Sequence, residues 1–486
     1  MISFIISLIA LVVGYFIYGK IVEKAFGADE KITTPAIRLE DGVDFVPLPW
    51  WKIFLIQFLN IAGLGPIFGA IMGAMFGPAA FLWIVFGCIF AGAVHDYFTG
   101  MLSIRHDGAS VPEIVGKYLG NGVRQFMRVF SVILLVLVGV VFVTGPAGLL
   151  AGLTPEKLDK TFWLYVIFAY YILATLVPID ALIGKVYPIF GICLLIMAVG
   201  VGGALIINGY QIPEIVPSNL INMHGKAATT PLFPVLFVTI ACGAISGFHA
   251  TQSPLMARCI TNEKQGRGIF YGSMIAEGIV ALIWAAAAMS FFGTGANDGV
   301  AKLNEAMAAN GNNAAWAVNV ICNSLLGKVG GALAILGVVA CPITSGDTAF
   351  RSARLTIADA INYKQEKIKN RLIISIPLFV VGFALTKIDF NIIWRYFGWS
   401  NQALATVVLW ASAVYLTHIK KSHWLASVPA AFMTAVSIAY IIVAPEGFGL
   451  PSSIGNIAGL IGMVAVYGVF LSNANKGKSI NDSKAV

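Results

Sequence analysis

Long apolar segments separated by short polar stretches run along most of the chain. A helix needs about 20 apolar residues to cross a bilayer. Segments of about that size are predicted at residues 2–18, 51–76, 79–104, 124–151, 161–177, 185–208, 231–254, 268–292, 330–348, 372–387, 390–417, 424–444 and 453–471. Their apolar runs are continuous and not alternating, which is typical of helices and not of β-barrel strands. The pattern predicts an all-α polytopic membrane protein with about 13 transmembrane helices.

One region between these segments has a mixed pattern. Residues 293–326 are rich in Asn and Gly, and only residues 301–309 have the pattern of a short amphipathic helix. We expect an extracellular excursion here, partly re-entrant, which leaves an error of one or two in the helix count.

Two of the apolar segments are interrupted near their centres. The first contains Gly-Leu-Gly-Pro at residues 63–66, and the second contains glycines, small hydroxyl residues and Pro254. Proline and glycine both weaken a helix. Non-helical backbone at membrane depth is tolerated only where it is buried in protein or lines a cavity. Either segment alone could be a kink used for packing, but two breaks at matching places indicate a transporter binding site.

The two broken segments divide the chain into comparable parts. Five spans begin with each, and the second series enters the membrane from the opposite side, which is the leucine-transporter (LeuT) type of 5+5 inverted repeat. We therefore expect residues 1–50 to form an N-terminal helix and cytoplasmic loop, 51–208 the first repeat, 209–230 a linker, 231–417 the second inverted repeat, 418–472 two C-terminal helices, and 473–486 a cytoplasmic tail.

Side chains at the two breaks are candidate substrate contacts. They are Asn60, Gly63, Gly65, Ser246, Phe248 and His249. A half-helix that starts after Gly65 presents free N–H groups and a helix dipole that favour an anion, so we expect a substrate with a carboxylate. Arg395 could hold that carboxylate through two hydrogen bonds, or could instead bridge to Asp96 or Asp347 as a structural or gating pair.

A candidate cation site lies in the stretch of residues 341–348. In LeuT-type transporters a sodium ion lies between carbonyls of the first broken helix and a Thr-Ser pair on the third helix of the second repeat, where this chain has Thr344 and Ser345. Hydroxyl and carbonyl oxygens are the hard ligands that small cations prefer. We expect Thr344, Ser345, Asp347 and carbonyls near Ala62 to couple transport to an ion, unless the hydroxyls bond to their own helix.

Three further ionisable residues lie inside predicted spans. They are His95, Asp96 and Glu277. Such groups are costly in a membrane and usually functional, so we assign them to a proton relay or a gate. A structural pairing is the alternative for each, and metal binding by the histidines together with His249 also stays open.

Composition supports the membrane interpretation. The 486 residues are 58% hydrophobic and 11% charged, whereas ordinary globular chains have about 25% charged residues. The net charge of +8 is spread over loops, so we expect the bilayer and not nucleic acid as the partner. Lysines and arginines concentrate in alternate loops, which predicts an outside N-terminus and a cytoplasmic C-terminus. Residues 2–18 lack a basic region before them and are expected to be a retained helix, not a cleaved signal peptide.

Enzyme chemistry has no positive support in the sequence. The six cysteines show no metal-binding spacing, and neither a serine or cysteine triad nor a phosphate loop is present. We therefore expect no enzyme activity and no cofactor, only a coupling H⁺ or Na⁺.

At several motifs the chain resembles the carbon starvation protein A (CstA) family of bacterial membrane proteins. The motifs are FLNIAGLGP at 58–66, AGAVHDY at 91–97, RHDG at 105–108, SGFH at 246–249, TSGDTAFR at 344–351 and FGWSNQ at 397–402. His95 stands where many relatives carry Gln, and many relatives have additional C-terminal spans. The resemblance implies nutrient uptake across the bacterial inner membrane during carbon starvation, with peptides as the usual substrate and pyruvate, with protons, for some relatives.

These observations favour a secondary active transporter that imports peptides and is driven by a proton or sodium gradient. The alternative is a symporter of protons with pyruvate or another small carboxylate. A channel would need a continuous line of polar pore positions, and a membrane sensor would need a signalling domain, and the sequence offers neither. It does not indicate any protein partner.

Overall fold

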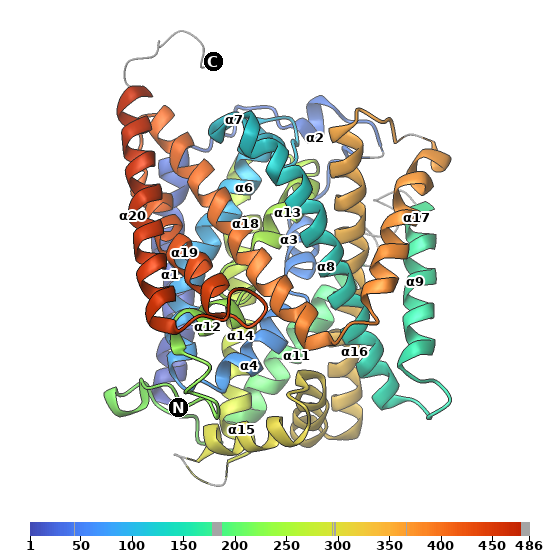
Figure 1. The fold of residues 1–486 in the computed structure, drawn as a ribbon. Helices are drawn as coiled ribbons and strands as arrows, with labels where there is room; N and C mark the ends of the chain where they lie inside the picture. Colours follow the sequence, from blue (N-terminus) through green and yellow to red (C-terminus); the bar gives the residue numbers. More distant parts are fainter. Residues whose placement is uncertain (43, 177–186, 294, 296–297, 366, 478–486) are drawn as a thin grey trace.

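The fold is entirely helical over the part of the chain that the structure, a computed structural model, describes. It describes residues 1–42, 44–176, 187–293, 295, 298–365 and 367–477 (Figure 1). In chain order the elements are α1 (Ile2–Phe26), α2 (Pro35–Arg38), α3 (Trp50–Ile61), η1 (Gly65–Gly69), α4 (Ala70–Ala74), α5 (Ala79–Gly87), η2 (Cys88–Gly92), α6 (Ala93–Arg105), α7 (Val111–Leu119), α8 (Asn121–Leu153), α9 (Lys160–Leu176), α11 (Tyr187–Ile207), η3 (Pro217–Asn219), α12 (Leu232–Thr239), α13 (Gly247–Ala257), η4 (Glu263–Gln265), η5 (Arg267–Tyr271), α14 (Gly272–Phe291), α15 (Gly299–Ala309), α16 (Ala314–Ala360), α17 (Ile368–Leu385), α18 (Phe390–His418), α19 (Trp424–Val443) and α20 (Ser452–Gly477).

Many of these helices are long and apolar enough to cross a membrane. Nine described helices meet that condition, and ten if the bent pair α3 and η1–α4 counts as one span. The nine exclude α9, which has only 17 residues, the broken segment of α12 and α13, and α18. The chain is therefore a multi-pass membrane protein, while the total of about 13 spans stays a prediction.

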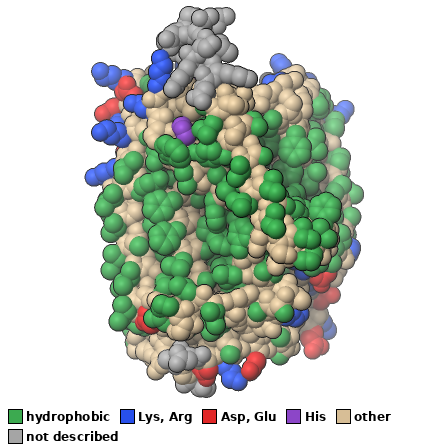
Figure 2. All heavy atoms as spheres, turned by 60° about the vertical axis from the view of Figure 1, so that its left-hand side comes forward, with side chains coloured by type: hydrophobic (Ala, Val, Ile, Leu, Met, Phe, Trp, Pro, Cys, Tyr) green, Lys and Arg blue, Asp and Glu red, His purple; other side chains and the backbone are tan. Residues whose placement is uncertain are grey.

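The surface is consistent with a lipid environment. Helices α1, α17 and α20 are mostly exposed and carry large apolar side chains on their outer faces. Figure 2 shows such side chains in a broad belt, with charged side chains gathered toward its upper and lower margins. Inside this ring the segments α5–α6 and α14 are largely buried. A buried inner layer surrounded by apolar helices is the arrangement expected where lipid replaces water.

Both interruptions predicted from the sequence are confirmed. Helix α3 ends at Ile61 and the chain bends by 54° before η1 and α4 continue. Helix α12 ends at Thr239, residues 240–246 are not helical, and α13 begins at Gly247. In each case the break falls on the small residues that lower helix propensity.

Two predicted boundaries are wrong. Helix α1 continues to Phe26, past the predicted polar loop start, and ends where Gly27 takes a left-handed conformation. The predicted excursion over 293–326 contains the expected short helix α15, but its second part is helical because α16 already begins at Ala314. A non-helical residue, Gly327 with φ 68° and ψ 179°, divides α16 near the predicted span start. The predicted span limits at 177 and 185, and much of the predicted tail, lie outside the described residues.

The beginning of α1 and the end of α20 lie at opposite ends of the molecule (Figure 1). Opposite ends are what an odd number of crossings requires. Which end faces the cytoplasm, and whether the two helix series form an inverted repeat, stay predictions.

Candidate functional site

The two breaks lie directly against each other at the centre of the molecule. A Cβ atom added at Gly65 would lie 2.3 Å from Cys242 Sγ, and one added at Gly69 would lie 2.9 Å from the carbonyl oxygen of Thr239. Any side chain at these positions would collide with the opposite segment. The glycines thus allow the backbones of the two broken segments to approach closely.

A cluster of four ionisable side chains lies beside the breaks, and we call it the acid–histidine cluster. His95 and Asp96 come from α6, His249 from α13 and Glu277 from α14, and all four are fully buried. Asp96 is the centre of the cluster. One of its oxygens lies 2.8 Å from His95 Nδ1 and the other 2.9 Å from His249 Nδ1. The structure thus brings together the predicted relay residues and one predicted substrate residue, His249.

Several polar atoms of this cluster have no hydrogen-bond partner among the described residues. His249 Nε2 lies 3.3 Å from Glu277 Oε2, which is close enough for an ion pair but is not aligned as a hydrogen bond. Both Glu277 carboxylate oxygens and His95 Nε2 also lack a partner. Buried groups of this kind are costly unless they are paired or take up a proton or a ligand. The cluster can therefore hold a proton or a cation.

At the predicted cation site, side chains of α16 form hydrogen bonds with carbonyl oxygens of the first broken segment. Ser345 Oγ lies 3.0 Å from the carbonyl oxygen of Leu59, and Cys341 Sγ lies 2.9 Å from that of Ala62. Thr344 Oγ1 donates to the carbonyl oxygen of Cys341 on its own helix. Helix α16 lies where the prediction required, but protein donors already reach the carbonyls that a cation would use.

Asp347, the fourth residue of that prediction, points toward another charge on its own helix. Its carboxylate lies 3.9 Å from the Arg351 guanidinium, and both side chains are buried. This pair is spaced as neighbours on one helix face.

Arg395 does not bridge to Asp96 or Asp347, and that expectation is wrong. Its Nε lies 3.0 Å from a carboxylate oxygen of Glu446, in the segment between α19 and α20. The side chain is 41% exposed. Because Arg395 lies only about one turn into α18, its side chain reaches this outer connection and not the centre.

Asn60, a predicted substrate contact, is fully buried. Both atoms of its side-chain amide are buried and have no hydrogen-bond partner among the described residues, and the same holds for Gln57 one turn earlier. An unsatisfied buried amide marks the position of a water, ion or ligand. These amides lie on α3 just before the break.

Other residues at the centre were missed by sequence reasoning. Phe142 on α8 packs against Gly63 and makes an edge-to-face contact of 5.7 Å with Phe248. Asn401 on α18 accepts a 2.6 Å hydrogen bond from the Phe248 amide, which holds the start of α13 beside Ser246. Asn401 lies in the family-like motif FGWSNQ, which was a usable signal, whereas Phe142 lies in a uniformly apolar run.

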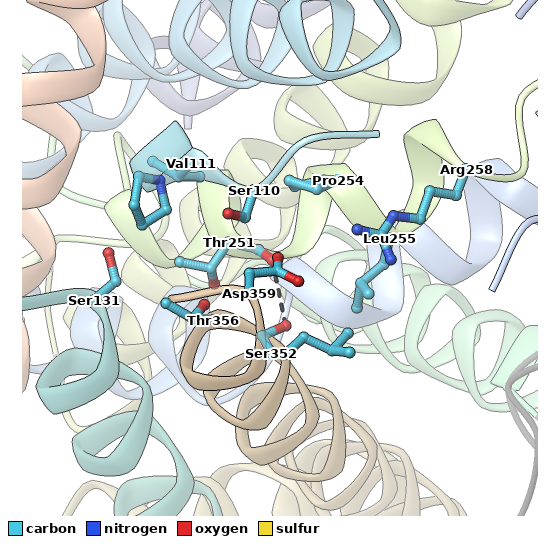
Figure 3. A pocket seen from close by; sticks show the side chains of 12 residues that line it. Ser110, Val111, Ser131, Thr251, Pro254, Leu255, Arg258, Ser352, Thr356 and Asp359 are labelled. Atoms are coloured by element: carbon cyan, nitrogen blue, oxygen red, sulfur yellow. Dashed lines mark hydrogen bonds between the residues drawn. The ribbon is translucent and has the colours of Figure 1, made fainter. Parts of the chain in front are cut away.

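A small cavity with a mixed polar and apolar lining lies further along α13, toward the end of the molecule that carries α7 (Figure 3). Its volume is about 30 Å³, enough for about one water molecule. Hydroxyl groups of Ser131, Thr251, Ser352 and Thr356 line it, and Ser352 Oγ donates a 3.3 Å hydrogen bond to the Thr251 carbonyl. Thr251 and His249 are two residues apart on α13, so the cavity and the acid–histidine cluster lie against different faces of this helix.

Family comparison agrees with the motifs. The family described as "Carbon starvation protein CstA" matches residues 1–156, 151–328 and 319–440. The chain belongs to the CstA family. An uncharacterized membrane protein of Haemophilus influenzae is 47% identical over 60% of this chain and 91% of its own length. The peptide transporter CstA of Escherichia coli is 24% identical over 88% and 78%.

Two further similarities concern other transporters. The pyruvate/proton symporter BtsT of Escherichia coli is 25% identical over 54% of this chain and 45% of its own length, so the chain matches about half of it. The structure of a mutant manganese transporter from Eremococcus coleocola aligns with a TM-score of 0.53 and 14% identity, over 90% of this chain and 99% of the other. At that identity the likeness concerns the fold alone. The relatives CstA and BtsT are named as transporters.

Proposed function

We propose that this CstA-family chain is a secondary active transporter that imports peptides across the bacterial inner membrane and is driven by a proton gradient. The observation that carries the proposal is the acid–histidine cluster, which lies fully buried beside two broken helices. A buried group that gains and loses a proton changes the charge of the centre, and so changes which conformation is favoured.

Protons are favoured over sodium by the hydrogen bonds at the first break. A sodium ion at the predicted site would need the carbonyl oxygen of Ala62, and this oxygen accepts a hydrogen bond from Cys341. The neighbouring Leu59 oxygen lies within hydrogen-bond distance of both Cys341 and Ser345. A cation would have to displace these donors, whereas a proton on Glu277 would satisfy an oxygen that has no partner among the described residues.

The route to the interior is proposed to follow α13. The cavity of Figure 3 lies between α7, α8, α13 and α16. Its hydroxyl groups provide a polar lining for a solute or proton that leaves the centre toward the α7 end, which the loop charges predict to be cytoplasmic.

Pyruvate is the second candidate substrate. The proposed proton coupling favours pyruvate, because one relative is named as a pyruvate/proton symporter. This chain matches about half of that relative's length. Peptides are placed first because the relative named as a peptide transporter matches over most of both chains. Both substrates carry a carboxylate.

The test is uptake into proteoliposomes. Labelled dipeptide and labelled pyruvate are offered separately under an imposed proton gradient or an imposed sodium gradient. We expect saturable, concentrative uptake of the dipeptide under the proton gradient alone. Glu277→Gln should reduce that uptake roughly tenfold or more, a barrier change of about 1.4 kcal/mol or more, because the glutamine cannot carry the proton.

A matched control and clear opposite outcomes accompany the test. Glu305→Gln removes an exposed carboxylate on α15 that pairs with Lys302, so uptake should be unchanged. Uptake that follows sodium and ignores protons would overturn the coupling proposal. Concentrative uptake of pyruvate without dipeptide would replace the substrate, and flux that never saturates or concentrates would indicate a channel.

A further inference from the structure

We propose that the second break forms a binding site for a transition-metal dication of the zinc class, with Cys242, His249 and Glu277 as its protein ligands. The site itself does not depend on the proposed transport function, although its consequence for transport does. Among the described residues these three form the one group of histidine, cysteine and acidic side chains placed to hold a metal ion.

The geometry brings three suitable donor atoms together. Cys242 Sγ, an imidazole nitrogen of His249 and a carboxylate oxygen of Glu277 all lie within 4.8 Å of one another, and all three residues are buried. Tetrahedral zinc with bonds of about 2.0–2.3 Å holds its ligand atoms about 3.5 Å apart. The three ligand atoms therefore need to approach by only about 1 Å. His249 Nε2 and a Glu277 oxygen are already 3.3 Å apart, so the approach concerns Cys242.

The donor types favour zinc over magnesium, calcium or sodium. A thiolate, an imidazole and one carboxylate are the mixed soft and intermediate ligands that zinc and its chemical neighbours select. Hard cations prefer sites built from oxygen alone. Cys242 is the residue that makes this difference.

Asp96 supplies the second element of a metal site. Its carboxylate lies 2.9 Å from His249 Nδ1, while His95 Nδ1 lies 2.8 Å from its other oxygen. Metal-bound histidines usually donate their other ring N–H to a carboxylate, which fixes the tautomer. With Nδ1 directed to Asp96, Nε2 of His249 is the nitrogen left for a metal, and it lies 3.3 Å from a carboxylate oxygen of Glu277.

Several polar atoms at the proposed metal site have no hydrogen-bond partner among the described residues. His249 Nε2 and both Glu277 carboxylate oxygens have no hydrogen-bond partner among the described residues, although their side chains are fully buried. Cys242 Sγ lies 3.5 Å from both Asn401 Nδ2 and Ser246 Oγ, ordinary distances for hydrogen bonds to sulfur that a metal ligand could exchange. A dication would bind the ligand atoms of all three residues at once, and it would neutralise the charges of the Cys242 thiolate and the Glu277 carboxylate.

Metal binding and proton coupling would then exclude each other. The thiol must lose its proton, and His249 Nε2 must be unprotonated, before they can bind a metal. Zinc should therefore hold the centre without a coupling proton and inhibit transport. Since the cluster is buried, the ion would enter when the transporter opens to one side.

The test uses cobalt(II) as a spectroscopic probe on the full chain, purified in detergent without a polyhistidine tag and freed of metal with a chelator. Cobalt bound to a thiolate gives a charge-transfer band in the near ultraviolet, and elemental analysis gives the stoichiometry. We expect about one ion per chain and a thiolate band that Zn²⁺ displaces. Cys242→Ser should abolish the band, and Glu277→Gln should weaken binding at least about tenfold.

Cys259→Ser is the matched control. Cys259 is also buried, but its Sγ lies 3.6 Å from the Leu255 carbonyl oxygen and it does not belong to the cluster, so the band should persist. Zn²⁺ should also raise the unfolding temperature of the wild type and of Cys259→Ser, but not of Cys242→Ser.

Absence of bound cobalt, or a band that survives Cys242→Ser, would overturn the site. If Cys242→Ser does not fold, the near-isosteric Glu277→Gln decides in the same way by its loss of affinity. Because these measurements need no transport, a failure of the metal site is distinguishable from a failure of the uptake experiment.

Discussion

At the scale of single residues, the centre depends on positions that have no side chain. Gly65 touches Cys242 so closely that a Cβ atom would lie 2.3 Å from both its Cβ and its Sγ. Neither segment can move aside without disturbing the acid–histidine cluster, since Cys242 and His249 belong to the same broken segment. The contact therefore fixes the distance between the two breaks.

Gly65→Ala should destabilise the protein by about 1–3 kcal/mol, the usual cost of inserting a methyl group into a packed interior. Thermal unfolding in detergent measures the effect. Adding Cys242→Gly to the same chain removes both colliding atoms and should restore part of the lost stability. Gly148→Ala on α8, where a Cβ atom would meet nothing within 4 Å, should be neutral or slightly stabilising, and equal losses in the two alanine variants would refute this account of the contact.

Sequence reasoning at this scale found costly residues but not all of their partners. Buried charges and helix-breaking glycines stand out because a membrane makes them expensive, so Asp96, His249 and Glu277 were identified. Pairing depends on which helices meet, and Arg395 meets Glu446 from the next connection, not Asp96. Phe142 gave no signal, because one aromatic residue in an apolar run looks like any other packing residue.

At the scale of elements, α16 consists of two helical parts that meet at a non-helical residue, Gly327. It covers Ala314–Ala360, and Gly327 has φ 68° and ψ 179°. That region of backbone conformation is essentially open to glycine only. This break separates the part before residue 327 from the longer part after it, which carries Cys341, Ser345 and Asp347.

Gly327→Ala should lower stability by about 1–3 kcal/mol through backbone strain alone, because nothing lies within 4 Å of a Cβ atom there. Thermal unfolding again provides the measurement. The control is Gly203→Ala on α11, which also has open space but an ordinary helical backbone. If both variants unfold at the wild-type temperature, Gly327 is not strained as described.

The lengths of the apolar segments predicted the positions of the helices well, but they predicted the ends of the helices poorly. The breaks at 62–64 and 240–246 were predictable because glycine and proline act locally. The end of α1 was not, because Lys20 and Lys24 can continue a helix once it leaves the bilayer. A local left-handed Gly27 stops it instead.

At the scale of the whole molecule, the arrangement predicts which surfaces share a compartment. The amide of Ile2 donates a 2.9 Å hydrogen bond to Glu214, so the linker lies at the same end as the start of α1. Helix α7 lies at the opposite end (Figure 1). Loop charges assign the first end to the outside and the second to the cytoplasm.

A cysteine introduced at Lys226, which is exposed on the linker, should react with a membrane-impermeant maleimide in intact cells. A cysteine introduced at Lys117, which is exposed on α7, should react only after the membrane is permeabilised. The unmodified chain, in which five cysteines are buried and Cys193 is partly exposed, gives the background. The reverse pattern would refute the assignment by charge, and labelling of both sites in intact cells would contradict the arrangement of the ends.

The contact between Gly65 and Cys242 also limits how the chain can change over generations. The two residues lie in different predicted repeats, on opposite sides of the linker at 209–230, yet each limits the size of the other. A chimaera that joined the part before the linker from one relative to the part after it from another would need a compatible pair at these positions. We therefore expect such an exchange between diverged relatives to be tolerated only where that pair fits.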